Sequence, residues 1–255
     1  MRRPRRAGDA VELVVRDGVA WMTLARPATE NRLDAELLGA LAAACAAVED
    51  DERARVAVLG ARGRVFSAGL PPDCAWPEPA WPEGIGAVAA LTKPVLAAIG
   101  GDALGWGFSL ALACDVRIAA TTAMFALPEV AAGCLPGGGI TQRLPRIVGP
   151  ARALELLLLG TPLLARRAAD WGVVAAAVPP ARLAAAVGDA ARALAARAPL
   201  ALRLGKEAVV RALDLPLEEG IRLEQDLYVL LQTTADRREG IAAFRARRQP
   251  RFRGR

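Results

Sequence analysis

The sequence predicts an α/β fold, and three observations point to that class. Short apolar runs typical of buried strands occupy residues 55–61, 94–101 and 115–120. An Ala- and Leu-rich segment with helical spacing, residues 33–51, precedes the first of them, and two alternating apolar runs lie within residues 11–25. This succession of strands and helices favours sheets that are covered by helices.

The N-terminal part is expected to form a hairpin and then a helix. Asp17-Gly18 interrupts the alternating runs of residues 11–25, and this dipeptide is typical of a hairpin turn. Asp34 stands at the start of the helix expected at 33–51, where its side chain can accept a hydrogen bond from a free N–H group. Residues 70–83 contain five prolines and two tryptophans, so we expect a loop there. Two interpretations of that loop stay open, a pocket rim and plain packing.

Helices dominate the C-terminal half. Strand patterns fade after residue 138, apart from residues 172–178, and the glycines of 136–140 predict a turn before a helix. The last helices are amphipathic but have no predicted sheet to cover, which favours packing against another subunit or a neighbouring domain. The helices expected here cover residues 150–160, 180–197, 200–213 and 216–235.

Histidine is absent from the chain, and this excludes several classes of active site. Without an imidazole there is no Ser–His–Asp or Cys–His nucleophile and no histidine-bearing zinc site. Lysine occurs only at Lys93 and Lys206 and tyrosine only at Tyr228, so carboxylates are the candidate catalysts. The four cysteines lie far apart with no Cys-x-x-Cys pair, so we predict neither a metal site nor a redox pair.

The arginines behind the net charge of +6 are concentrated at the two ends of the chain. Two interpretations stay open: solvated tails, or contact with an anion such as a ligand phosphate or a nucleic acid. No apolar stretch approaches the ~18 residues that a membrane span needs, and no signal peptide is recognisable. We therefore expect a cytoplasmic protein with no membrane partner.

Two short segments bring glycine, and so a closely approachable backbone, to the end of an expected element. One is FSAGL at residues 66–70, just past a strand, and the other is GWGFS at residues 105–109, at a helix start. Backbone N–H groups at a helix start are free and carry partial positive charge. Two such sites facing each other would form an oxyanion hole, which stabilises negative charge on a carbonyl oxygen.

Four blocks of sequence resemble the enoyl-CoA hydratase/isomerase (crotonase) superfamily, and they extend over nearly the whole chain. GRVFSAGL at 63–70 and GDALGWGFSLALACDVRIA at 101–119 look like the two oxyanion-hole motifs of that family. The stretch from FALPEV to LELLLLG, residues 125–160, looks like its most characteristic block. DRREGIAAF at 236–244 resembles its helical tail.

The resemblance implies a crotonase-like spiral of repeated ββα units in residues 1–195 and a helical oligomerisation region in residues 196–255. It implies a homotrimer or a dimer of trimers, with an acyl-CoA thioester as substrate. Coenzyme A would then be part of the substrate, so no separate cofactor is expected. Nucleic acid is not the expected partner.

In the family, two backbone N–H groups form the oxyanion hole, and the resemblance places them on Leu70 and Trp106. Trp106 departs from the usual glycine, so its side chain must either narrow the acyl pocket or turn away and pack. Hydratases of the family use two glutamates, and the matching positions here are Glu129 and Ser109. One carboxylate is therefore kept and one is missing.

Further residues are expected to contact the substrate. The resemblance puts the adenine and pantetheine of coenzyme A near the first oxyanion-hole motif and the end of the first hairpin. A C-terminal arginine is the candidate for a phosphate contact, with a solvated side chain as the alternative. The candidate substrate-binding residues are Arg26, Ala28, Ala68, Leu70, Gly105 and Arg248.

A single carboxylate suits one reaction of the family better than the other. Adding water to a double bond needs one group to activate the water and another to protonate C2, and a serine here has no base to take its proton. Moving a double bond needs only Glu129, which can take a proton from C2 of a 3-enoyl thioester and return it to C4. We therefore predict a Δ3,Δ2-enoyl-CoA isomerase.

Two alternatives stay open. One is a hydratase-like or biosynthetic tailoring crotonase, with water held by Ser109 or supplied through the substrate; residues 125–160 resemble hydratases. The other is a weakly catalytic accessory or RNA-binding member of the family that acts through its arginine-rich ends.

Overall fold

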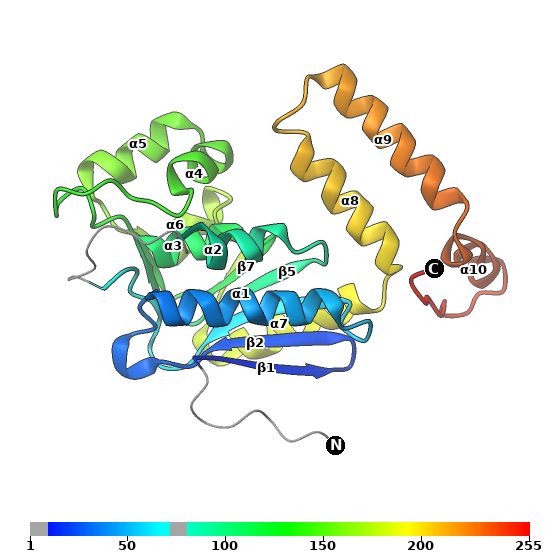
Figure 1. The fold of residues 1–255 in the computed structure, drawn as a ribbon, viewed down its shortest axis with the longest axis horizontal. Coiled ribbons are helices and arrows are strands. Elements are labelled where there is room, and N and C mark those ends of the chain that lie inside the picture. The colour runs from blue at the N-terminus through cyan, green and yellow to red at the C-terminus, as the bar shows by residue number, and fades with distance from the viewer. Residues whose placement is uncertain (1–9, 72–80) are drawn as a thin grey trace.

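Residues 10–71 and 81–255 form an α/β core and an arm of helices that projects from it (Figure 1). These are the residues that the computed structural model describes. Two sheets build the core, and helices pack against them. None of the helices in this described part is both long enough and apolar enough to cross a bilayer.

The larger sheet contains six strands in the order β1-β2-β3-β5-β7-β10. β1 and β2 form the predicted hairpin: they pair antiparallel, and Asp17 and Gly18 between them have the positive φ that a two-residue turn of this kind requires. All other neighbours in this sheet pair parallel. The strands are β1 (Val11–Arg16), β2 (Val19–Leu24), β3 (Val56–Ala61), β5 (Val95–Ile99), β7 (Val116–Ala120) and β10 (Ala176–Val178). The predicted strands of this sheet are therefore confirmed.

Both faces of the larger sheet are covered, which explains why its parallel strands are continuous apolar runs rather than alternating ones. On β3, Leu59 packs in one buried cluster with side chains of α1 (Ala35–Asp50). Its neighbour Val58 packs in a second cluster with side chains of α7 (Pro180–Ala195). The sheet is thus sandwiched between these two helices.

A smaller sheet of four short strands, which the sequence did not predict, completes the core. Its order is β4-β6-β8-β9. Along the chain, a strand of the larger sheet, a strand of the smaller sheet and a helix follow one another three times, as β3-β4-α2, β5-β6-α3 and β7-β8-α4. This is the repeated ββα arrangement that the resemblance implies. The strands are β4 (Val65–Ser67), β6 (Asp102–Leu104), β8 (Met124–Ala126) and β9 (Leu163–Leu164).

The core helices confirm most of the predicted boundaries. The side chain of Asp34 accepts a hydrogen bond of 2.8 Å from Leu37 N and caps α1, as expected. The loop expected at 70–83 needs a correction, because residues 81–83 form the first turn of α2, where proline is tolerated; residues 72–80 lie outside the described part. The remaining core helices are α2 (Trp81–Ala90), α3 (Trp106–Ala113), α4 (Ile140–Val148), α5 (Pro150–Leu159) and α6 (Ala165–Asp170).

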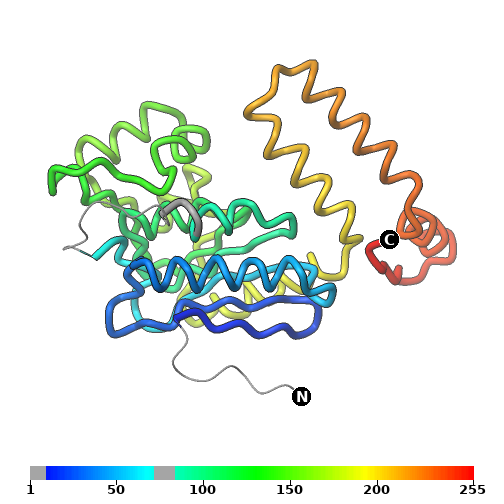
Figure 2. Tube along the Cα trace, in the orientation of Figure 1, coloured from blue at the N-terminus to red at the C-terminus, as the bar shows by residue number. Residues whose placement is uncertain are grey.

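The arm consists of α8 (Pro199–Arg211), α9 (Leu217–Gln232) and α10 (Ala235–Arg245), and it stands away from the sheets (Figure 1, Figure 2). An ion pair ties α8 to the core, with Lys206 Nζ 2.7 Å from the Asp115 carboxylate. The arm begins just after α7, close to the boundary expected at residue 195. Its expected role in oligomerisation stays a prediction.

Candidate active site

Two turns that follow neighbouring strands bring the glycine segments together. β4 leads into Gly69 and Leu70, while β6 leads into Gly105 and then Trp106, the first residue of α3. Because β4 and β6 pair parallel, their carboxyl ends lie at the same edge of the smaller sheet. A Cβ atom placed on Gly69 would lie only 3.3 Å from the Trp106 nitrogen. The segments predicted to carry the two oxyanion donors are therefore neighbours in space.

The turn that carries Leu70 is held by residues just after the first hairpin. Asn31 is fully buried, and its Nδ2 donates hydrogen bonds of 2.9 Å to both Arg62 O and Val65 O. Arg32 donates a hydrogen bond of 2.8 Å to Leu70 O. Within the described residues, no group accepts a hydrogen bond from the Leu70 N–H. That N–H is thus available to a ligand as far as residues 10–71 and 81–255 are concerned.

Glu129 lies against the turn that carries Trp106. Its backbone position follows β8, the strand next to β6 in the smaller sheet. Gly105 has φ +51°, and a Cβ placed on it would lie 1.9 Å from Glu129 Oε1. The Trp106 N–H lies near enough to the same carboxylate to lower its pKa. Only glycine at position 105 leaves room for this arrangement.

Burial raises the pKa of Glu129 above its ordinary value, because the carboxylate loses hydration. Hydrogen bonds from the N–H groups of Glu129 and Trp106 lower the pKa in part. Oε2 is buried and has no hydrogen-bond partner in the described part of the chain. The Glu129 carboxylate therefore combines a raised pKa with an oxygen that has no partner in the described residues. Such a group is placed to exchange a proton with a bound carbonyl compound.

Ser109 lies one turn into α3 and is fully buried. Its Oγ donates a hydrogen bond of 2.7 Å to Gly137 O, and a Cβ placed on Gly138 would lie 2.9 Å from Ser109 Cβ. The hydroxyl hydrogen is therefore engaged by the backbone that precedes α4. A catalytic part for Ser109 stays a prediction.

The Trp106 side chain is packed rather than exposed, with 4% of the residue accessible to solvent. A Cβ placed on Gly137 would lie 2.3 Å from Trp106 Cζ2, so the indole rests directly against the backbone there. The indole therefore packs against the segment that precedes α4, while the other outcome expected for this departure from glycine, a narrowed acyl pocket, stays a prediction.

The candidate substrate-binding residues near the first hairpin lie close to the first oxyanion turn. Ala68 N donates a hydrogen bond of 3.0 Å to Glu30 O, which joins the turn to the segment that contains Arg26 and Ala28. Arg26 forms ion pairs with Asp34, at 2.6 Å, and with Glu36. Contact of Arg26, Ala28, Ala68, Leu70 and Gly105 with a substrate stays a prediction.

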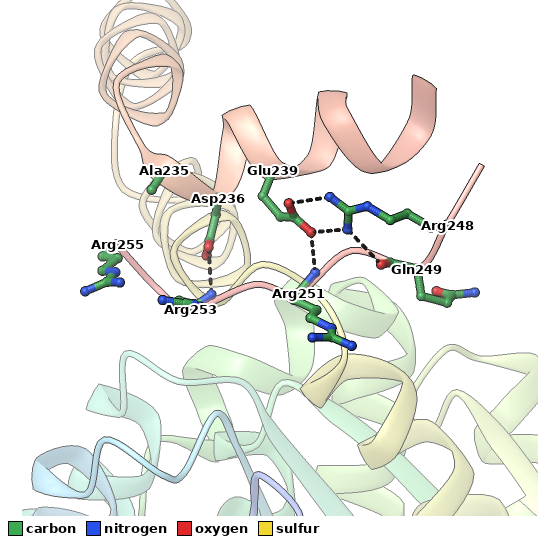
Figure 3. Close-up of a pocket in the computed structure, with 8 residues that line it drawn as sticks. All are labelled: Ala235, Asp236, Glu239, Arg248, Gln249, Arg251, Arg253 and Arg255. Atoms are coloured by element: carbon green, nitrogen blue, oxygen red, sulfur yellow. Dashed lines mark hydrogen bonds and ion pairs between the residues drawn. The ribbon is translucent and has the colours of Figure 1, made fainter. Parts of the chain in front are cut away.

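Arg248 follows α10, and α10 lies at the other end of the molecule from α3 (Figure 1). Both terminal nitrogens of its guanidinium bond to Glu239, at 2.6 and 2.8 Å, on the rim of a cavity of about 760 Å³ (Figure 3). Arg251 N also donates to this carboxylate, and the resulting contacts lower the pKa of Glu239 to about 2. A phosphate contact by Arg248 stays a prediction.

Several residues that build the site were missed by the sequence analysis. Asn31, Arg32 and Arg143 each hold backbone carbonyls of a loop at the site; Arg143, for example, donates a hydrogen bond of 2.8 Å to Gly138 O. Their partners are mostly distant in sequence, so no local pattern indicates them. A positive φ at Asn31 is the conformational signature of its turn, and asparagine tolerates it well.

Comparison with known proteins gives one consistent family. The family model for enoyl-CoA hydratase/isomerase matches residues 15–255. An (E)-benzylidenesuccinyl-CoA hydratase of Thauera aromatica is 40% identical over 258 residues, covering 96% of this chain and 99% of that protein. A 2,3-dehydroadipyl-CoA hydratase of Escherichia coli is 36% identical over 253 residues, with 96% and 99% covered. The crystal structure of an enoyl-CoA hydratase from Bacillus anthracis has a TM-score of 0.93 at 33% identity, with 96% and 100% covered.

These similarities include the arm as well as the core, since each extends over nearly the whole chain. They also agree with the repeated ββα arrangement of the core. The chain belongs to the enoyl-CoA hydratase/isomerase (crotonase) family.

Proposed function

We propose that this member of the family forms an enolate from an acyl-CoA thioester and shifts a double bond from C3 to C2, with Glu129 as the only acid/base group. The observation that carries the proposal is the position of Glu129 against Gly105 and the Trp106 N–H, next to the turn of Leu70. The thioester oxygen would bind the N–H groups of Leu70 and Trp106. Coenzyme A enters as part of the substrate.

The reaction then needs two proton transfers by one carboxylate. Glu129 removes a proton from C2 of a 3-enoyl thioester, and the electron pair of that C–H bond moves toward the carbonyl oxygen, which the two N–H groups stabilise. The enolate electrons then form the double bond between C2 and C3, while the electron pair of the C3–C4 double bond takes the proton from Glu129 and becomes the new C4–H bond. Oxyanion-hole donors of this kind contribute on the order of 10²–10³ each to a rate.

A hydratase is the second candidate, and the relatives favour it. The Thauera aromatica and Escherichia coli relatives are named as hydratases. Hydration would need a second group to handle water, and the family position for it is Ser109, whose hydroxyl donates to Gly137 O. This contact favours the isomerase, because it leaves Glu129 without a second acid/base group at that position.

The deciding experiment compares two thioesters. We expect conversion of 3-hexenoyl-CoA to 2-hexenoyl-CoA and little hydration of crotonyl-CoA, with Glu129→Gln lowering the first rate by about 10²–10⁴. Hydration of crotonyl-CoA at a rate equal to the isomerisation would instead establish the hydratase. Activity that survives Glu129→Gln would refute the role of Glu129 in either reaction.

We also propose that the arm is the contact between copies of this chain in a trimer or a dimer of trimers. Large apolar side chains on α8 to α10 are exposed in the single chain, among them Val209, Leu217 and Phe244 at 71, 80 and 85%. An apolar surface of this kind is typical of a protein interface. Light scattering of the purified chain should give the mass of a trimer or hexamer, and Leu217→Glu should reduce it.

A further inference from the structure

Trp106 and Ser109 lie one turn apart on α3, and both contact the segment that precedes α4. The Ser109 hydroxyl donates a hydrogen bond of 2.7 Å to Gly137 O. The indole of Trp106 lies so close to Gly137 that a Cβ there would be 2.3 Å from Cζ2, 2.7 Å from Cε2 and 2.9 Å from Nε1. Ser109 in turn leaves no space for a side chain at Gly138. The Trp106 and Ser109 side chains therefore pack closely against Gly137 and Gly138, which leaves no space for a side chain at either glycine.

The segment held in this way starts at Glu129. Cys134 N and Ala132 N both donate hydrogen bonds to Glu129 O, at 2.8 and 3.0 Å, so the chain turns back directly after the carboxylate. The far end of the segment is fixed at Gly137 and Gly138, where Arg143 also donates to Gly138 O. Glu129 thus lies against Gly105 at the start of α3, and the other end of the segment contacts side chains of α3.

We propose that Trp106 and Ser109 act as a clamp on Gly137 and Gly138 and are positioning residues for Glu129. The clamp keeps the segment closed against α3, so that the carboxylate stays buried beside Gly105. This inference rests on the proposed function of Glu129 as the acid/base group. It also gives Ser109 a part in the reaction that does not require its hydroxyl to touch the substrate.

The clamp matters for the reaction because the pKa of the Glu129 carboxylate depends on its burial. Burial is the main cause of the raised pKa of Glu129. In this proposal the clamp preserves that burial by holding residues 129–138 in place. Removing the Ser109 hydroxyl leaves Gly137 O without that donor, and adding a methyl group at Gly137 forces the indole out of its place. Either change admits water to the carboxylate and lowers its pKa toward the ordinary range.

The test uses amide hydrogen exchange together with pH profiles. Ser109→Ala and Gly137→Ala are compared with Gly86→Ala, a matched control because a Cβ on Gly86 meets nothing within 4 Å. We expect exchange of the amides of residues 129–138 to become about tenfold faster in Ser109→Ala, the size expected for one lost hydrogen bond. Exchange should also become faster in Gly137→Ala, because the added methyl group displaces the indole of Trp106. The control should leave it unchanged.

The same variants should lower kcat for 3-hexenoyl-CoA and move the acid limb of its pH profile to lower pH. A second substitution provides a rescue: Trp106→Phe lacks the indole nitrogen and Cζ2, so Gly137→Ala should cost less in that background than in the natural chain. Such coupling between neighbouring residues is measured by a double-mutant cycle. Ser109→Ala removes one atom only and remains informative if Gly137→Ala fails to fold.

Two outcomes would overturn the clamp. In the first, exchange of residues 129–138 matches the Gly86→Ala control, whatever happens to the activity. In the second, exchange rises but kcat and its pH profile stay as in the natural chain, so the segment loosens without affecting Glu129. If the natural chain instead converts no enoyl thioester, the proposed function is wrong, whereas the exchange measurement still decides whether the segment is clamped.

Discussion

The carboxylate of Glu129 occupies the space that a side chain at Gly105 would take, since a Cβ there would lie 1.9 Å from Oε1. The residue that follows Gly105 is Trp106, whose N–H lies near enough to this carboxylate to lower its pKa. The candidate base and a candidate oxyanion donor are therefore in contact before any substrate arrives. A thioester oxygen that takes the Trp106 N–H would loosen this contact and leave the carboxylate a stronger base.

Gly105→Ala should disable the enzyme because the methyl group and Glu129 cannot share one place. We expect kcat for 3-hexenoyl-CoA to fall by about 10²-fold or more, the effect of displacing one essential group. Because Gly105 has φ +51°, the substitution should also lower the free energy of unfolding by about 1–3 kcal/mol. Gly39→Ala is the matched control, since a Cβ there meets nothing within 4 Å. Equal activities of the two variants would contradict the close approach of Glu129.

The activity should depend on pH through Glu129, which must be deprotonated to act as a base. Burial raises the pKa of this carboxyl, so kcat/KM should be constant at neutral pH and fall as the pH drops through a value above the ordinary 4.5. The profile of kcat reports the bound state, in which the thioester competes for the Trp106 N–H, so its acid limb should lie at higher pH still. Rate profiles from pH 4 to 8 would test this, and an acid limb at or below 4.5 would count against the role of Glu129.

Much of the larger sheet could be predicted from the sequence because its elements carry their own signals. β3 and β5 are apolar runs of six and five residues, and β7 is apolar apart from Arg117. The hairpin has its Asp17-Gly18 turn, and α1 has Asp34 as its cap. The smaller sheet could not be predicted, because its strands have two or three residues and show no periodicity. Such strands form only because their neighbours in the sheet are already in place.

The glycine patterns alone indicated the two oxyanion segments, and the resemblance assigned individual residues within the site. Glu129, Leu70 and Trp106 follow from family motifs, and their segments do lie together. The bond from Ser109 to Gly137 joins residues 28 positions apart, so nothing near either residue indicates it. The same holds for Asn31, whose partners lie 31 and 34 positions away.

Ser109→Glu is expected to fail as a way to restore hydration. The serine is fully buried, its hydroxyl is bonded to Gly137 O, and a Cβ placed on Gly138 would lie only 2.9 Å from Ser109 Cβ. A carboxylate there would have to move residues 137 and 138 or lie buried without a partner, which costs several kcal/mol. Thermal unfolding should show a large loss of stability and assays should show no gain in crotonyl-CoA hydration. A stable variant with new hydratase activity would show instead that the segment before α4 adapts.

An ion pair between Lys206 on α8 and Asp115 before β7 joins the arm to the core, with its atoms 2.7 Å apart and its side chains 11 and 26% exposed. Lys206 also donates to Lys93 O, and Asp115 accepts a hydrogen bond of 2.7 Å from Val95 N. Lys206→Ala should therefore lower the free energy of unfolding by about 1–3 kcal/mol, the range for a lost hydrogen bond to a charged group, and speed amide exchange in α8. Arg222→Ala is the control, because its contact with Glu218 is 4.0 Å long between side chains 75 and 87% exposed, and pairs of that kind contribute about 0–1 kcal/mol. Equal urea midpoints for the two variants would show that α8 is held by other contacts.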